Sequence, residues 1–383
     1  MNEGRSAFTT WSCLSSPEVY MRRLVSLLAV LAAAPLSAQS NARPCPAGAA
    51  LIASVPQATD AMPGMSMATA GSAVQVDSVR HEMRIVAGPF RIAPMAHETD
   101  DMMMMDTPVL RVAWPVSGWV RGYSVQLCDG DATGGKALAQ GMVHHVGIAN
   151  YSRRELLYPM VERLMAVGKE TPRVSLPGNV GVPLASGDTL GLYSAFHDVN
   201  GATVERAYVI VTLPWIPAGH AHPIVVMPFF ADVNCVIGGT SAWDLRPGRS
   251  ERSSEFTMPL GGALLALGGH VHDYARSVRL EDAENGKVLV KLDTKLTADG
   301  HLIALGKRVF GFHEEGLALI AHHRYRVVAV YYNPTGHTLK QGAMASMAGA
   351  FMPDDVAEWP KLDRTSLDVQ RDIASVGAHD MVQ

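Results

Sequence analysis

The sequence has few charged residues and no cluster of basic ones. Only 18% of its 383 residues are Asp, Glu, Lys or Arg, and the formal net charge is −4. A nucleic-acid-binding surface needs a basic patch that neutralises phosphates, so we expect no nucleic-acid partner. The chain also lacks an apolar run of about 20 residues, which a membrane-spanning helix needs, so we expect no membrane span.

Familiar catalytic motifs are absent as well. The sequence contains no Ser or Cys nucleophile elbow and no phosphate-binding loop. What it has in excess are histidine and methionine, with 15 His and 20 Met residues that are clustered rather than evenly spread. The candidate chemistry therefore rests on imidazoles and thioethers.

The beginning of the chain is typical of a secretory signal. Met21-Arg22-Arg23 supplies a basic start, Leu24 to Ala34 supplies an apolar segment, and small residues allow cleavage after Ala38. We expect translation to start at Met21, residues 1–38 to be a leader and signal peptide, and the product to be periplasmic or secreted. Export exposes thiols to oxidation, and two of Cys45, Cys128 and Cys235 can pair there, but the sequence does not decide which.

Residues 39–107 are rich in Met, Pro and Ala, and we expect a largely flexible segment with a strand or two inside it. The clusters Met62–Met67 and Met102–Met105 lack the periodicity of core residues. Soft thioethers select Cu(I), so these clusters suit either a copper-collecting segment or a plain low-complexity linker. We expect residues 39–75 to be dispensable for the fold.

From residue 108 the pattern becomes all-β. Many short β-rich runs alternate with turn signals such as Asn285-Gly286 and Asp299-Gly300, and Glu155 to Val167 is the one stretch with a helical pattern. This pattern predicts two antiparallel β-sandwich domains in tandem, at residues 108–216 and 217–359, followed by a loosely held tail at 360–383.

The most informative motif is Gly268-Gly269-His270-Val271-His272, which follows an apolar run. Two histidines at i and i+2 of a strand point to the same face, so both imidazoles can reach one metal ion. In a helix they would point about 200° apart, which favours the strand. Two hydrogen-bonded histidines without a metal are the alternative interpretation.

Other histidines complete the candidate ligand set. His144 and His145 are adjacent, so they can share a metal only at a strand end or a β-bulge. His197 ends a predicted strand, and Met344 and Met347 lie in the last strand of the second unit. His220 and His222 form a second HxH in a proline-rich connector, and we expect them to lie away from the other ligands.

The order of an HH pair, a single strand-end His, an HxH and then a Met resembles the type II copper, ascorbate-dependent monooxygenases. That family contains dopamine β-monooxygenase and peptidylglycine α-hydroxylating monooxygenase, and the separations between the motifs are similar here. The resemblance covers about residues 109–353. It implies two jelly-roll-like sandwiches that face each other across a water-filled cleft.

The resemblance further implies two copper ions, O₂, a small-molecule substrate, and ascorbate or another one-electron reductant as co-substrate. An electron-transfer copper is expected on His144, His145 and His197, and an oxygen-activating copper on His270, His272 and Met344. Three imidazoles suit copper in both oxidation states, whereas two imidazoles and a thioether favour Cu(I). The catalytic residues are then His270, His272 and Met344, while the substrate and the oligomeric state stay open.

The sequence departs from that family near the substrate. Gly268 stands where the peptide-amidating branch has an arginine, so an anchor for a peptide carboxylate is missing. Met347 lies three residues after Met344, so on a strand it faces the opposite side and is expected in the core.

Three other interpretations of the histidine motif are open. A periplasmic copper-binding or copper-handling protein without turnover uses the same residues. A metallo-β-lactamase-type hydrolase needs His at the fifth position after the first histidine, where this chain has Ala275, and a cupin needs a Glu much closer than Glu281. Copper chemistry on an all-β fold is therefore the expectation.

Overall fold

The computed structural model describes residues 45, 70–92, 105–107, 109–131, 134–168, 173–177, 179–196, 202–219, 223–234, 241–311 and 316–378. These residues form two β-sandwiches, as the all-β pattern predicts. Within the described residues, no helix is long and apolar enough to cross a membrane.

The first sandwich packs a nine-stranded sheet against a five-stranded one. The larger sheet has the order β1-β2-β13-β5-β11-β14 with β6, β7 and β10 at its side, and the smaller has the order β3-β12-β8-β9 with β4 on β12. The bounds are β1 (Gly71–Asp77), β2 (Glu82–Ile92), β3 (Met105–Asp106), β4 (Leu110–Ala113), β5 (Gly118–Val120), β6 (Gly122–Asp131), β7 (Gly134–Ala137), β8 (Val143–Arg154), β9 (Val161–Gly168), β10 (Arg173–Ser175), β11 (Val180–Leu184), β12 (Thr189–Phe196), β13 (Val204–Pro217) and β14 (Ile224–Val225). A short 3₁₀ helix, η1 (Gln140–Met142), precedes β8.

The second sandwich packs two five-stranded sheets and carries a two-stranded sheet of β16 and β25. One large sheet has the order β15-β26-β18-β22 with β23 on β18, and the other has the order β17-β24-β19-β20-β21. The bounds are β15 (Met227–Asp232), β16 (Trp243–Leu245), β17 (Gly248–Thr257), β18 (Gly262–Val271), β19 (Ala275–Asp282), β20 (Val288–Leu296), β21 (Leu302–Leu305), β22 (Arg308–Val309), β23 (Leu317–Leu319), β24 (Arg324–Asn333), β25 (Leu339–Ala343) and β26 (Ala345–Pro353). A 3₁₀ turn, η2 (Val356–Glu358), and a helix, α2 (Leu367–Ala378), follow.

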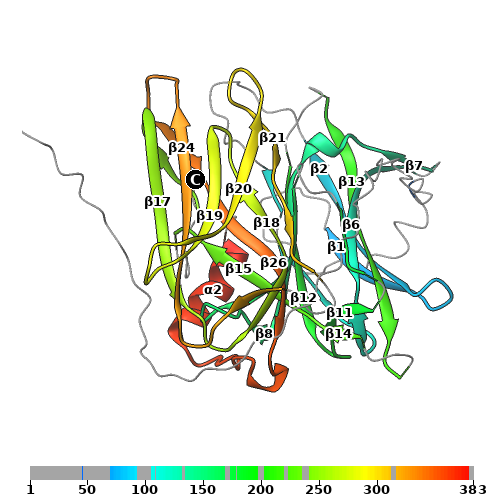
Figure 1. Cartoon of the computed structure of the whole chain (residues 1–383). Coiled ribbons are helices and arrows are strands. Elements are labelled where there is room, and N and C mark those ends of the chain that lie inside the picture. The colour runs from blue at the N-terminus through cyan, green and yellow to red at the C-terminus, as the bar shows by residue number, and fades with distance from the viewer. Residues whose placement is uncertain are drawn as a thin grey trace, which may run out of the picture.

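Each sandwich has a hydrophobic core of its own, and the strand pattern explains how it forms. In β13, Val209, Val211 and Leu213 alternate into the first core, and in β24, Tyr325, Val327 and Ala329 alternate into the second. Burial of such side chains contributes about 1.5–3 kcal/mol each. Figure 1 shows the resulting layers side by side, with β18 and β26 of the second sandwich next to β8 and β12 of the first.

The two predicted turns are present. Asn285-Gly286 connects β19 to β20, and Asp299-Gly300 connects β20 to β21. Gly286 has a φ of +73° and Gly300 a φ of +98°, backbone angles that residues other than glycine rarely adopt. The domain boundaries themselves stay predictions: apart from Leu156, which packs into the second core, the buried residues of the two cores fall on either side of residue 217.

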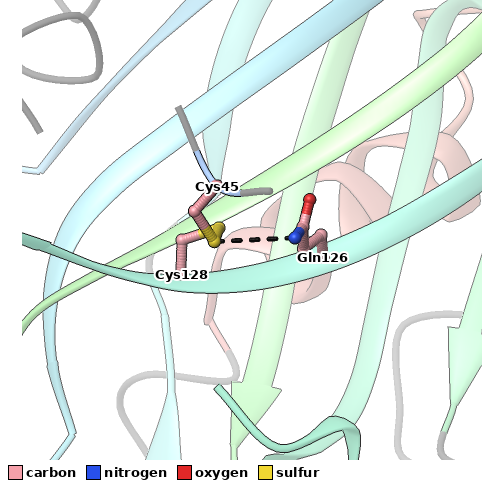
Figure 2. Close-up of a disulfide and its surroundings, with 3 residues drawn as sticks. All are labelled: Cys45, Gln126 and Cys128. Atoms are coloured by element: carbon pink, nitrogen blue, oxygen red, sulfur yellow. Dashed lines mark hydrogen bonds between the residues drawn. A yellow bond between two sulfur atoms is a disulfide. The ribbon is translucent and has the colours of Figure 1, made fainter. Parts of the chain in front are cut away.

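The segment before residue 108 contains the expected strands, and they belong to the first sandwich. β1 and β2 form part of the larger sheet of the first sandwich, because β2 pairs with the central strand β13. Cys45 forms a disulfide with Cys128 of β6, and Gln126 donates a hydrogen bond to the Cys45 sulfur at 3.5 Å, as Figure 2 shows. Residues 39–75 therefore contain two attachments to the fold. Cys235 and both methionine clusters, except Met105 of β3, lie outside the described residues.

The expected helix at 155–167 is wrong, because residues 161–168 form the strand β9. In this strand Glu162 is buried and Arg163 is half-buried. The Arg153 guanidinium lies 3.3 Å from the Glu162 carboxylate, and Arg163 binds Asp372 of α2 through two contacts of 2.5 and 3.1 Å.

The same ion pair corrects the expectation of a loose tail. Asp372 also accepts a hydrogen bond from the Val161 amide at 2.9 Å, and the Trp359 indole donates to the Arg154 carbonyl at 2.9 Å. Residues 360–378 are thus attached to β9 and to the end of β8, and residues 379–383 lie outside the described part.

Loss of the disulfide is expected to destabilise the first sandwich. Cys128→Ser reopens a loop with a sequence separation of 83 residues, and the restored entropy of the unfolded chain costs about 2–4 kcal/mol. Chemical denaturation under oxidising conditions measures this. The reduced wild type serves as the control, because it should fall to the stability of the variant, and equal stability of oxidised wild type and variant contradicts the prediction.

The buried carboxylates of this region predict a pH dependence of stability. Burial raises the pKa of Glu155 to about 8 and that of Glu162 to about 7, from an ordinary value of 4.5. The folded state then keeps protons that the unfolded state releases, so the free energy of unfolding falls as the pH rises from about 4.5 to about 8. Each group contributes a slope of up to about 1.4 kcal/mol per pH unit in this window.

Glu155→Gln should flatten that slope, whereas Glu205→Gln, which changes an exposed partner of Arg91, should leave it unchanged. Denaturation curves at a series of pH values measure the slope for the three proteins. A slope in Glu155→Gln that equals the wild-type slope would show that Glu155 is ionised in the folded state.

Candidate metal site

The histidines of the HxH motif lie at the end of β18, on the face that points away from the second core. β18 pairs with β26 in a register that places His270 opposite Ser346 and Val271 opposite Ala345. Val271 and Ala345 are buried in the second core. Because successive residues of a strand alternate between its faces, His270 and His272 share the other face. Their ring centroids are 5.2 Å apart.

Met344 is positioned beside His272 by the backbone. Continuing the register by one residue places these two opposite each other, and the His272 amide donates to the Met344 carbonyl at 3.3 Å. The Tyr331 hydroxyl forms hydrogen bonds with both residues. It accepts hydrogen bonds from the His272 amide (3.1 Å) and the Met344 amide (3.3 Å), and it donates one to the Met344 carbonyl. Directly opposite residues share a face, so this position adds a thioether to the two imidazoles.

Met347 has the opposite orientation. It pairs with Gly269, is 0% exposed and belongs to the second core. The prediction that Met347 is a core residue is therefore confirmed. Burial of a thioether in that core is explained by packing alone.

A β-bulge brings His144 and His145 to the same side of β8. Val143 and Val146 are both buried in the first core although they are three residues apart, which regular alternation does not allow. The register of β8 against β12 shifts by one residue at His144, which is the extra residue of the bulge. The ring centroids of the two histidines are 5.1 Å apart, and that of His145 lies 6.0 Å from that of Tyr193.

The bulge of β8 meets the end of β18 where the two sandwiches pack together. The ring centroid of His144 lies 6.3 Å from that of His270 and 5.9 Å from that of His272. This differs from the expected two separate ligand clusters across a water-filled cleft, because the described histidines of both sets form one cluster. The reason is direct packing of the sandwiches, which also buries an apolar cluster of Val180, Val226 and Leu265.

Three of the predicted histidines are not described. β12 ends at Phe196, so His197 comes next in the chain but lies outside the described residues. His220 and His222 of the connector lie outside them too. Their positions relative to the cluster stay predictions.

The types of side chain in the histidine cluster limit which metal ions it can bind in the observed arrangement. Among the described residues, no three or more His, Cys, Asp or Glu side chains are arranged as ligands of one metal ion. The side chains on the β18 face that the sequence predicts as ligands are two imidazoles and one thioether, a combination outside this description. Asp273, which follows the motif, has a structural role: His301 Nδ1 lies 2.7 Å from its Oδ2, and the Leu302 amide donates to its Oδ1 at 2.6 Å.

Two residues near the cluster were missed from the sequence. Tyr331 is buried, which raises the pKa of its hydroxyl and keeps it a hydrogen-bond donor. Asp232 of β15 is 0% exposed, and burial raises the pKa of its carboxyl to about 7, while charge interactions with Arg252 and His270 act in the other direction. No local sequence motif identifies either residue, because they come close to the histidine cluster only through the pairing of strands that are distant in the sequence.

Comparisons with known proteins add little. No protein-family model matches the chain, and no curated protein matches it. The major capsid protein P2 of bacteriophage PM2 aligns with 66% of this chain and 99% of its own length, at 9% identity and a TM-score of 0.30. PNGF-II aligns with 77% of this chain and 84% of its own, at 11% identity and a TM-score of 0.29. A fucolectin from striped bass covers 69% of this chain at 10% identity and a TM-score of 0.18. Such low scores support no inference about function.

The opposite faces of the two methionines make a testable distinction. In copper-loaded, reduced protein, X-ray absorption should detect a sulfur ligand that Met344→His removes, because only this thioether lies on the histidine face. Met347→Leu nearly conserves volume, so it should keep the sulfur signal and cost less than about 1.5 kcal/mol of stability. A sulfur signal that survives Met344→His and vanishes in Met347→Leu would reverse the assignment.

Proposed function

We propose that this chain is a copper-dependent monooxygenase that hydroxylates a small molecule with O₂ and a one-electron reductant such as ascorbate. The observation that supports this most is the strand register, which gives His270, His272 and Met344 one common face. Two imidazoles and a thioether suit Cu(I) and leave coordination positions open. The bulge of β8 presents His144 and His145 to the same place, and we assign the second copper to these two together with His197.

Copper bound there supplies one-electron redox chemistry and the binding of O₂, which protein side chains alone do not provide. The chain's own residues hold the ligands in place. Tyr331 links the backbone of Met344 to that of His272, so these two backbone segments cannot move apart without breaking its hydrogen bonds. Ring contacts between His144 and the HxH pair give electrons a short path between the ligand sets.

The proposed location is the periplasm or the outside of the cell, because the segment Met21–Ala38 has the composition of a secretory signal. An oxidising compartment also suits the disulfide between Cys45 and Cys128. We propose a small-molecule substrate, because Gly268 itself offers no side chain that could anchor a peptide carboxylate. The charged side chain beside this position is that of Lys307, whose Cγ would lie 3.7 Å from a Cβ at Gly268.

A copper-binding or copper-handling protein without turnover is the second candidate. The close contact of the histidine rings favours it, because 5.9 Å between the centroids of His144 and His272 leaves no room for a substrate between them.

Metal analysis and O₂ consumption separate these candidates. We expect the wild type to bind two copper ions and to consume O₂ with ascorbate, and His270→Ala to lose one copper and most of the O₂ consumption. His337→Ala, which changes an exposed histidine in the turn after β24, is the matched control. Copper binding without O₂ consumption supports the copper-handling protein. Stoichiometric zinc, or no bound metal, contradicts both candidate functions.

A further inference from the structure

Asp232 is a buried carboxylate on the face of the sheet that carries His270. The register pairs Asp232 of β15 with Ser346 of β26, and Ser346 with His270 of β18. Directly opposite residues of antiparallel strands point to the same face, so Asp232 and His270 flank Ser346 from both sides. Ser346 is only 6% exposed, so little water separates them.

The charge of Asp232 is not needed for its local structural role. Its Oδ1 accepts a hydrogen bond from the Asn234 amide at 2.7 Å, which an asparagine at position 232 can also do. Its Oδ2 is buried and accepts no hydrogen bond of normal geometry among the described residues, although the Ser241 side chain is near enough to lower the pKa of the carboxyl. A buried polar atom without a partner costs about 1–3 kcal/mol, so packing and turn formation do not explain a carboxylate here.

The cations that interact with this carboxylate are few. Arg252 and His270 are the positively charged groups that lower its pKa against the effect of burial. Arg252 is an exposed residue with a partly desolvated guanidinium, which lies 5.1 Å from the Trp243 ring centroid and makes no ion pair with Asp232 within the described part of the chain. A charge in a low-dielectric interior acts over a longer range than in water, so a cation bound at His270 would interact strongly with Asp232.

We propose that Asp232 is a positioning residue whose negative charge stabilises the more highly charged Cu(II) state of the metal held by His270, His272 and Met344. The inference rests on copper binding in the proposed function but not on turnover. A carboxylate near a ligand favours the doubly charged ion over the singly charged one by Coulomb attraction. It thereby sets the balance between the two oxidation states at a site whose thioether alone favours Cu(I).

Asp232→Asn tests the charge alone, because the amide keeps the size and the Oδ1 acceptor for Asn234. At pH 8, the ratio of Cu(II) to Cu(I) affinity, measured by competition with chromogenic chelators, should fall about tenfold, because removal of a nearby negative charge weakens the attraction for the doubly charged ion more than for the singly charged one. For a one-electron couple this raises the reduction potential by about 59 mV. Asp282→Asn, which removes a carboxylate paired with His323 in the same sandwich, should leave the ratio unchanged.

Asp232→Ser removes the same charge and is used if Asp232→Asn does not fold. Unfolding at pH 8 separates a structural role from an electrostatic one, because loss of an unpartnered carboxylate should leave stability equal or higher. Copper binding by the wild type with an unchanged affinity ratio in the variant overturns this inference and leaves the proposed function standing. Absence of copper binding in the wild type overturns both.

Discussion

The pairing of β18 with β26 is the constraint on which the second sandwich and its candidate site both depend. One alternation sends Val271, Ala345 and Met347 into the core and His270, His272 and Met344 to the opposite face. A shift of one residue would bury the imidazoles and expose the apolar side chains, each of which contributes about 1.5–3 kcal/mol when buried. The geometry of the ligands is therefore maintained by the same free energy that maintains the core, and the site needs no separate scaffold.

The bulge at His144 has the same role for the first sandwich, since it lets Val143 and Val146 enter the core while both histidines leave it. The two faces then meet because the sandwiches are packed together at several places besides the histidines. The Tyr158 hydroxyl binds the Asp232 backbone, with its oxygen 3.0 Å from the Asp232 nitrogen, and its ring packs edge-on against Phe230. Because these contacts are buried, the relative position of the histidine pairs is fixed by packing rather than by a bound metal.

Features that depend on strand alternation and on turn residues could be predicted from the sequence. Features that depend on contacts between residues distant in the sequence could not. The all-β architecture, the glycine turns at Gly286 and Gly300 and the core position of Met347 follow from local pattern. The strand β9 could not be predicted, because Glu162 and Arg163 look solvated until Arg153 and Asp372 are seen beside them. The choice of Cys128 as the partner of Cys45, and the contact of His144 with the HxH pair, likewise require the tertiary arrangement.

The buried charges of the molecule fall into two kinds, and the difference bears on function. Glu162 lies beside Arg153, and Asp372 is compensated by Arg163, an ion pair that attaches α2 to β9. Removal of Arg163 would leave the Asp372 charge uncompensated in the interior, which is the costly case, so this pair is explained by architecture. Asp232 differs because one of its oxygens accepts no hydrogen bond of normal geometry in the described structure. An uncompensated carboxylate is a cost to folding, and such costs concentrate at functional sites, where a charge is needed for a ligand rather than for the fold. Its place beside Ser346 and His270, and not beside α2, is what links it to the histidine cluster.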